Sequence, residues 1–265
     1  MSAEPLAGPV SSSRWGQLLL LRDLYGPVYG SEDLCVLLYS LVRRERPKTV
    51  VELGAGLGVC TIWIANALAE LGEGHVWSID DGSHYIETEL VRTSVHCIAE
   101  DLGIMLDNGR STTYFDFLHG LVGALQLQEQ ITIVQERLDF STSLVNPDWS
   151  FVQRPIDWLF SDIAYGPDAV LTILRSFLPY MACHSSIFID SAPTFSPSRE
   201  LLDRLVEQLA RGERPPELQV GSSEEISFLG KTLSQRRFQL VHLTEVQDRR
   251  QNSTAWIRIE SKLDS

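Results

Sequence analysis

Short unbroken runs of apolar residues alternate along this chain with longer segments in which apolar residues recur every three or four positions. Runs of this length predict buried strands, and the longer spacing predicts helices that bury one face. The strands predicted in this way are residues 49–53, 75–80, 131–136, 156–162 and 186–190.

The segments around these runs have helical spacing. A helix is predicted from about Ser31 to Arg44, because Ser31 and the two acids after it form an acidic cap before a row of leucines. Residues 85–103 are predicted to form a single helix closed by Gly103. The remaining predicted helices cover residues 59–71, 112–126, 168–181 and 198–212.

Strand and helix alternate from residue 49 onward, which is typical of an open parallel sheet with helices on both faces. Two further strands, residues 238–246 and 253–261, follow with no helix between them and predict a hairpin. The sequence thus predicts an α/β doubly wound sheet, mostly parallel with an antiparallel edge strand. We expect an N-terminal helical lid segment at residues 1–46 and one domain at residues 47–265.

The composition supports one ordinary domain and argues against a nucleic-acid partner. Of the 265 residues, 44% are hydrophobic, which is enough for one well-packed core. The formal net charge is −13, and such a field repels a nucleic-acid backbone. Basic clusters such as residues 43–46 have acids nearby and are interpreted as solvated surface.

The spacing of the cysteines and the N-terminal sequence indicate the cellular compartment of the protein. The cysteines lie far apart, which favours reduced thiols over a zinc site or a disulfide framework. The N-terminal segment has an acid before any base, and its apolar run spans only residues 18–21, so it predicts neither a signal peptide nor a membrane span. We expect a cytoplasmic protein.

Three glycines follow the first predicted strand in the stretch VVELGAGLG, residues 50–58. Gly54, Gly56 and Gly58 stand at alternate positions before a predicted helix, as in a nucleotide-binding loop. A dinucleotide-binding loop has its third glycine one position later. Glu52, just before the glycines, would repel a pyrophosphate and attract a ligand with an ammonium or sulfonium group. A nicotinamide-dependent oxidoreductase is therefore the less favoured alternative.

The pattern Glu-x-Gly-x-Gly-x-Gly resembles motif I of the class I S-adenosylmethionine-dependent methyltransferases. The resemblance runs from about Thr49 to Asp190 with the motifs in the order of that family, and it implies a Rossmann-like sheet of seven strands. It also implies that S-adenosylmethionine is bound by Glu52, Gly54, Gly56 and Gly58.

Acids after the next two strands extend the resemblance. Asp80 and Asp81 end the second predicted strand, where a carboxylate can accept hydrogen bonds from both ribose hydroxyls. Asp80 ends the apolar alternation and is the predicted contact. After the third strand, Leu138 and Asp139 loosely match the family's apolar residue on the adenine ring and its acid at the exocyclic amine.

Candidates for the acceptor site follow the fourth and fifth strands, since ligands bind at the carboxyl ends of strands in such sheets. Asp162 and Asp190 resemble the two aspartates that hold magnesium in catechol-type O-methyltransferases, where the metal activates the acceptor hydroxyl. Those enzymes have an amide-bearing residue after the second aspartate, whereas Ser191 stands here. The alternative is that both aspartates cap strands and bind the methionine part of the cofactor or the protein backbone.

Other motifs leave alternatives open. The tetrapeptide Asp162-Ile-Ala-Tyr165 has the outline of the Asp-Pro-Pro-Tyr motif of amine-directed N-methyltransferases, without its prolines. His84 is interpreted as a surface histidine or as part of the lining of the cofactor site. Tyr25 and Tyr29 lie in the aromatic N-terminal segment that predicts the lid.

Together these features predict a methyltransferase that uses S-adenosylmethionine, with Mg²⁺ as a candidate second cofactor, and a hydroxyl of a small-molecule acceptor. The alternatives are N-methylation of a small amine or peptide-like metabolite, and a cofactor-binding scaffold without turnover. We expect no nucleic-acid or membrane partner. The aromatic stretch 114–127 is interpreted either as a lining of the acceptor site or as a contact in a homodimer. The predicted catalytic residues are Asp162, Tyr165 and Asp190, and the candidate metal ligands are Asp162 and Asp190.

Overall fold

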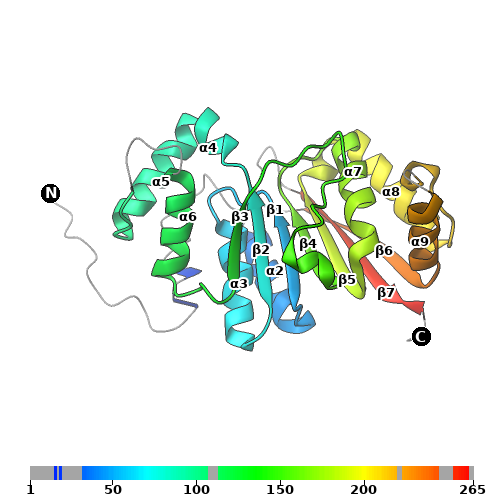
Figure 1. Ribbon diagram of the computed structural model, residues 1–265, viewed down its shortest axis with the longest axis horizontal. Helices are drawn as coiled ribbons and strands as arrows, with labels where there is room; N and C mark the ends of the chain where they lie inside the picture. Colours follow the sequence, from blue (N-terminus) through cyan, green and yellow to red (C-terminus); the bar gives the residue numbers. More distant parts are fainter. Residues whose placement is uncertain are drawn as a thin grey trace. The chain divides into compact units, whose positions relative to one another are not determined.

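A computed structural model describes residues 15–16, 18–19, 32–106, 113–219, 223–244 and 253–262 of the chain. Its strands form a seven-stranded sheet in the order β3-β2-β1-β4-β5-β7-β6 (Figure 1). The strands are β1 Thr49–Leu53, β2 His75–Asp80, β3 Ile131–Gln135, β4 Ile156–Ser161, β5 Met181–Asp190, β6 Arg236–Thr244 and β7 Ser253–Ser261.

The directions of the strands confirm the predicted fold class. The pairs β2–β3, β1–β4 and β4–β5 are parallel, while β7 is antiparallel to both of its neighbours, β5 and β6. The strand that runs against the others is therefore β7, one position in from the edge strand β6. No helix in the described ranges is long and apolar enough to span a membrane.

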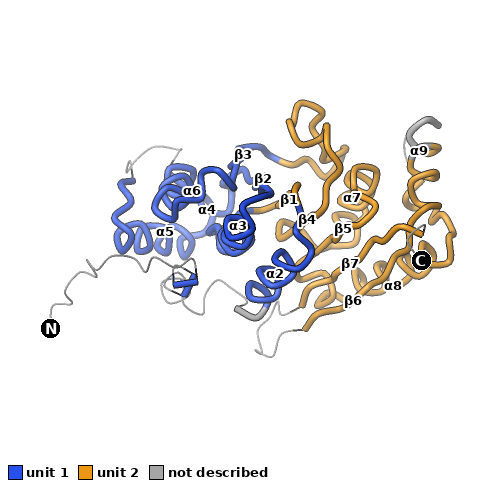
Figure 2. Tube along the Cα trace, turned by 90° about the horizontal axis from the view of Figure 1, so that it is seen from below, with its two compact units in different colours: residues 1–47, 55–137 blue, residues 48–54, 138–265 orange. Residues whose placement is uncertain are grey.

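The chain divides into two compact units, which Figure 2 shows in different colours. Unit 1 comprises residues 1–47 and 55–137, and unit 2 comprises residues 48–54 and 138–265. The chain therefore passes from one unit to the other on either side of β1 and again after β3.

Unit 1 packs helices against the parallel strands β2 and β3. The apolar faces of the helices share a core that includes Ile62, Phe117 and Leu121. Full burial of one such side chain contributes about 1.5–3 kcal/mol. The helices are α2 Glu32–Glu45, α3 Val59–Leu71, α4 Ser83–Glu87, α5 Glu89–Asp101 and α6 Thr113–Ala124.

Trp15 and Leu18, near the start of the predicted N-terminal lid segment, pack onto unit 1. Leu18 is fully buried in the core of unit 1. The ring of Trp15 packs edge-on against the rings of Tyr39 and Trp63, with centroids 5.5 and 5.8 Å away. This part of the segment is therefore held on α2 and α3. Tyr25 and Tyr29 lie outside the described residues.

Unit 2 is built on β1, β4 and β5 with the antiparallel strands β7 and β6. Large side chains such as Trp158 of β4 and Phe188 of β5 are almost completely buried, and their rings lie 4.8 Å apart. The helices of this unit are α7 Pro167–Phe177, α8 Ser196–Ala210 and α9 Ser223–Ser234, with short 3-10 turns η2 Ser150–Gln153, η3 Leu178–Tyr180, η4 Ala192–Thr194 and η5 Pro216–Leu218.

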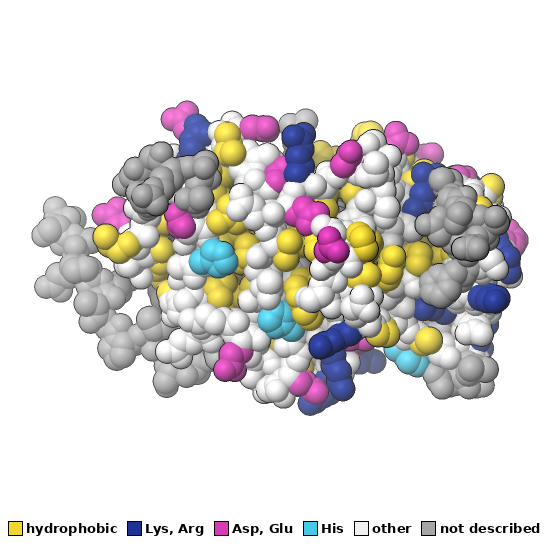
Figure 3. Space-filling model, in the orientation of Figure 1, with side chains coloured by type: hydrophobic (Ala, Val, Ile, Leu, Met, Phe, Trp, Pro, Cys, Tyr) yellow, Lys and Arg dark blue, Asp and Glu magenta, His cyan; other side chains and the backbone are white. Residues whose placement is uncertain are grey.

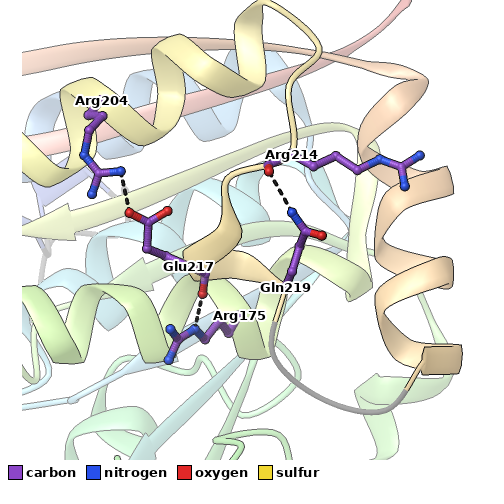
Figure 4. A network of polar contacts seen from close by, with 5 residues as sticks. All are labelled: Arg175, Arg204, Arg214, Glu217 and Gln219. Atoms are coloured by element: carbon purple, nitrogen blue, oxygen red, sulfur yellow. Dashed lines mark hydrogen bonds and ion pairs between the residues drawn. The ribbon is translucent and has the colours of Figure 1, made fainter.

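The connection after α8 is fixed by polar contacts of the turn η5 (Figure 4). The Glu217 carboxylate forms an ion pair with Arg204 of α8 at 2.5 Å, and the Glu217 carbonyl accepts a hydrogen bond from Arg175 of α7 at 2.6 Å. Glu217 thus joins two helices through one residue. Its own backbone N–H and Arg204 lower the pKa of this carboxyl, against an opposing effect of burial.

Some elements differ from those predicted. The helix expected at 85–103 is two helices, because Thr88 has an extended backbone with φ −115° and ends one while beginning the next. The strand expected at 186–190 begins earlier, at Met181, because the polar residues that start it hide its pattern. Helix α9 was not predicted from the sequence.

Candidate active site

The glycine loop has backbone angles that residues with side chains rarely adopt. Gly54, Gly56 and Gly58 all have positive φ, at 88°, 54° and 77°. A Cβ on Gly54 would lie 3.1 Å from the carbonyl oxygen of Asp162, and a Cβ on Gly58 would lie 3.2 Å from Leu121. At Gly54 and Gly58 both the conformation and the lack of space therefore favour glycine, and at Gly56 the conformation alone does.

The peptide at Gly56 is held from both sides within unit 1. Its N–H donates to Oδ2 of Asp80 at 3.2 Å, and its carbonyl accepts a hydrogen bond from the Tyr114 hydroxyl at 2.6 Å. No described atom lies within 4 Å of a Cβ built on Gly56. The loop is thus fixed at its middle glycine, and the space on the Cβ side of that glycine is open.

Asp80 is the predicted ribose acid, and it also closes the glycine loop. It ends β2 and is largely buried. Its Oδ2 accepts hydrogen bonds from Ala55 N at 2.9 Å and from Gly56 N, while Oδ1 accepts from Gly82 N at 2.7 Å. A carboxylate has about four lone-pair sites. With three hydrogen bonds accepted, the carboxylate has about one lone-pair site left for a ribose hydroxyl. The ribose contact stays a prediction.

Tyr114 of α6 is held by other aromatic rings. The ring of Tyr85 stacks on it at 5.8 Å, and the ring of Phe115 lies edge-on at 5.0 Å. Gly82 packs beneath this group, since a Cβ there would lie 3.1 Å from Tyr114. The tyrosine hydroxyl that contacts the glycine loop therefore has a well-defined position.

Glu52, Leu138 and Asp139 belong to unit 2. Glu52 is fully buried on β1, in register with Phe160 of β4. Leu138 is half-buried and Asp139 exposed. The Asp139 carboxylate accepts hydrogen bonds from the backbone N–H and the hydroxyl of Ser141, at 2.9 and 2.7 Å. This local turn orients Asp139, and its predicted adenine contact stays a prediction.

Asp162 and Tyr165 follow β4 as predicted and are exposed. The backbone N–H of Asp162 donates to the Leu53 carbonyl at 2.9 Å, and its own carbonyl lies against Gly54. This contact brings the predicted acceptor-site aspartate next to the first glycine of the loop. Both belong to unit 2, so the two predicted parts of the site meet here.

Asp190, at the end of β5, is buried among hydroxyls. Its Oδ1 accepts a hydrogen bond from Thr254 at 2.6 Å, and its Oδ2 accepts one from the Ser191 hydroxyl at 2.9 Å. Ser191 itself has a left-handed backbone with φ 61° and donates its N–H to the Ser253 carbonyl at 2.7 Å. The carboxylate thus joins the end of β5 to the start of β7.

These surroundings do not fit a magnesium site. Both oxygens of Asp190 already accept hydroxyl hydrogen bonds, and Ser191 turns its hydroxyl toward the carboxylate. Magnesium prefers several oxygen ligands in octahedral geometry. Within the described part of the chain, no group of three His, Cys, Asp or Glu side chains could hold a metal ion.

Two residues of the site, Tyr114 and Thr254, have no signal in the sequence that predicts their roles. Tyr114 was part of an aromatic stretch, and Thr254 was part of a strand. No spacing in the sequence links either residue to the glycine loop or to Asp190, because they lie 58 residues from Gly56 and 64 residues from Asp190. His84, the histidine that the sequence offered as a surface residue or as part of the cofactor-site lining, is exposed on α4.

Residues 51–192, more than half of the chain, match the family model described as a methyltransferase domain. The chain belongs to this methyltransferase family. The match confirms the resemblance to class I S-adenosylmethionine-dependent methyltransferases and the prediction of a methyltransferase enzyme. A comparison with the curated proteins finds no similar sequence.

Solved structures share the fold of this methyltransferase at low sequence identity. A putative O-methyltransferase from Klebsiella pneumoniae has a TM-score of 0.50 and 13% identity, over 98% of this chain and 92% of that chain. A cofactor-bound protein from MTB has a TM-score of 0.50 and 12% identity, over 99% and 100%. An O-methyltransferase from Bacillus cereus in complex with SAH has a TM-score of 0.49 and 13% identity, over 97% and 93%.

Proposed function

We propose that this methyltransferase transfers a methyl group from S-adenosylmethionine to a hydroxyl oxygen of a small molecule. The observation that carries the proposal is the glycine loop after β1, held by Asp80 and Tyr114 with open space at Gly56. Such a loop lets a ligand approach the backbone closely. The proposed cofactor contacts are Glu52, Gly54, Gly56, Gly58, Asp80, Leu138 and Asp139.

Asp162 is the proposed proton acceptor. It is exposed at the carboxyl end of β4, the end at which ligands bind in parallel sheets. In the transfer, the acceptor oxygen bonds to the methyl carbon, and the electron pair of the carbon–sulfur bond goes to sulfur. The Asp162 carboxylate takes the hydroxyl proton. Positioning of the acceptor and removal of its proton are the main tasks left to the protein.

Tyr165 and Asp190 have supporting roles in this proposal. Tyr165, three residues after Asp162, contributes an exposed ring to the acceptor side. Asp190 fixes the end of β5 through Ser191 and Thr254. No step of the proposed reaction passes through a metal, because the groups around Asp190 do not fit one.

Calorimetry with S-adenosylhomocysteine tests the cofactor. We expect saturable binding to the full chain at micromolar concentrations, and no binding of NAD. If NAD binds and S-adenosylhomocysteine does not, the proposal is wrong.

Replacement of Asp162 tests the proton acceptor. With any acceptor found in a panel of hydroxyl and amine compounds, Asp162→Asn should lower the rate about 10²- to 10⁴-fold, because the base is lost. Its affinity for S-adenosylhomocysteine should change little. Asp168→Asn, an exposed acid in the first turn of α7, is the matched control. Methylation of amines alone would show that the acceptor is nitrogen.

A further inference from the structure

Two exposed aromatic rings stand beyond the carboxyl ends of neighbouring strands in unit 2. Tyr165 follows β4 and is 41% exposed, and Phe195 follows β5 and is 44% exposed. Their rings are in edge-on contact, with centroids 6.4 Å apart and planes at 72°. Edge-on aromatic pairs at this distance are favourable, and this pair leaves part of each ring open to a ligand.

A buried serine fixes both segments that carry these rings. Ser198 of α8 is fully buried. Its hydroxyl donates to the Tyr165 carbonyl at 2.5 Å, and its N–H donates to the Phe195 carbonyl at 2.9 Å. One residue therefore ties the two loops together. The rings are presented by a fixed backbone rather than by independent loops, which is how binding residues are kept in register.

The segment that carries Tyr165 also contacts the glycine loop through Ile163. Ile163, between Asp162 and Tyr165, is 37% exposed. Its Cβ would lie 3.3 Å from a Cβ on Gly54, so it touches the first glycine of the loop. Ile163, Tyr165 and Phe195 are thus three exposed apolar side chains on the segments after β4 and β5, and the first of them lies at the cofactor loop, directly after the proposed base Asp162 in the chain. We name these three residues the aromatic platform.

We propose that the aromatic platform binds the methyl acceptor and selects a planar aromatic ring that carries the hydroxyl. This inference rests on the proposed function, and it names the class of its substrate. A planar ring can stack on one platform ring and meet the other edge-on, which a puckered saturated ring of the same size cannot do. Single exposed apolar side chains need no explanation, but an exposed aromatic pair held by one buried serine, on the segment that follows a proposed base, favours a binding role.

The test uses 1-naphthol and its saturated counterpart decahydro-1-naphthol as probes. Binding of each to the full chain is measured by calorimetry in the presence of saturating S-adenosylhomocysteine. We expect 1-naphthol to bind at least about fivefold more tightly than the saturated alcohol, the scale of an aromatic contact. Tyr165→Ala and Phe195→Ala should each weaken 1-naphthol binding by a similar factor.

Both variants remove a ring and keep the backbone carbonyl that Ser198 binds. Phe195→Leu, which keeps the apolar volume, serves if Phe195→Ala unfolds. Tyr180→Ala is the matched control, because Tyr180 is 36% exposed just before β5, at the opposite end of that strand from Phe195. It should leave 1-naphthol binding unchanged, and thermal unfolding should show all variants folded.

The outcomes separate this inference from the proposed function. If S-adenosylhomocysteine binds but 1-naphthol does not, the aromatic platform is overturned and the proposed function stands. Equal affinity for the two alcohols, or unchanged affinity in both platform variants, also overturns it. If S-adenosylhomocysteine does not bind, the proposed function itself fails.

Discussion

At the scale of single residues, the middle glycine of the loop shows how a flexible position is made rigid. Glycine loses more conformational freedom on folding than any other residue. At Gly56 the Asp80 carboxylate holds the N–H and the Tyr114 hydroxyl holds the carbonyl. The loop therefore needs little further ordering when a ligand binds, and preorganisation of this kind improves affinity.

Tyr114→Phe should weaken the binding of S-adenosylhomocysteine about two- to tenfold, because one hydrogen bond is worth about 0.5–1.5 kcal/mol. The turnover number at saturating cofactor should stay unchanged, since the hydroxyl positions the loop and touches no reacting atom. Calorimetry and steady-state kinetics measure the two effects.

The matched control is Tyr85→Phe, whose ring stacks on Tyr114. Tyr85→Phe should bind S-adenosylhomocysteine with the affinity of the natural protein. Unchanged binding in Tyr114→Phe would mean that aromatic packing, which both variants keep, and not the hydroxyl, holds the loop. Equal losses in both variants would mean that the effect is not specific to the Tyr114 hydroxyl.

The hydroxyls around Asp190 lead to a prediction about metal dependence. EDTA should leave the methyltransferase activity unchanged, because Ser191 and Thr254 occupy the carboxylate that a metal would use. Thr254→Val should lower the free energy of unfolding by about 1–3 kcal/mol, the cost of a buried group left without its hydrogen bond. Loss of activity in EDTA with recovery in magnesium would contradict this interpretation.

At the scale of elements, His75 joins β2 to the chain around the start of β3. Its Nδ1 lies 3.0 Å from the Glu129 carbonyl, and its Nε2 lies 2.8 Å from the Thr132 hydroxyl. A carbonyl can only accept, so Nδ1 carries the proton and Nε2 of the neutral ring accepts from Thr132. Burial lowers the pKa of His75 below its usual value of 6.5. The folded state thus prefers the neutral ring.

The contribution of the neutral His75 ring to the free energy of unfolding should therefore be fully present above the usual pKa. It should be lost as the pH falls through the lower pKa of the folded state. In urea unfolding between pH 7.5 and pH 5, the natural protein should lose more stability than His75→Asn, which cannot take up a proton. Parallel stability curves for the two proteins would contradict this.

The elements most easily predicted from the sequence were those with one clear pattern. The aliphatic run of β1 and the apolar spacing of α3 are both local signals, and both elements begin and end as expected. The break at Thr88 has no proline or glycine to mark it. The start of β5 is polar because Cys183 and His184 face outward there. In both places local pattern was a poor guide to tertiary structure.

The candidate site was predictable where a residue lies next to its motif. The glycine loop, Asp80 and Asp162 all stand at strand ends, and the sheet topology brings such positions to one edge. The partners of these residues come from distant segments. Neither the Tyr114 hydroxyl nor the Thr254 hydroxyl could be assigned before the fold was known.

At the scale of the whole molecule, charge is the property that most limits the partners. The formal net charge of −13 opposes binding to nucleic acid. In Figure 3, Lys and Arg side chains are interspersed with Asp and Glu. Some basic side chains of the chain form ion pairs within the fold, as Arg43 does with Glu70 and Arg46 with Glu73.

The passage of the chain between the two units has a consequence for the order of folding. β1 belongs to unit 2, but its parallel partner β4 comes much later, and the contact of Thr49 with Asp157 spans 108 residues. Closing such a long loop costs entropy before any contact repays it, so pairings of this kind form slowly. During synthesis, the strand that carries Glu52 must wait with its β4 side unpaired until β4 emerges. The contact of Gly54 with Asp162 is therefore completed late, whereas the contacts of Gly56 with Asp80 and Tyr114 use residues made before β4. A ligand that needs both the loop and Asp162 is expected to bind only after the strand pairing is complete.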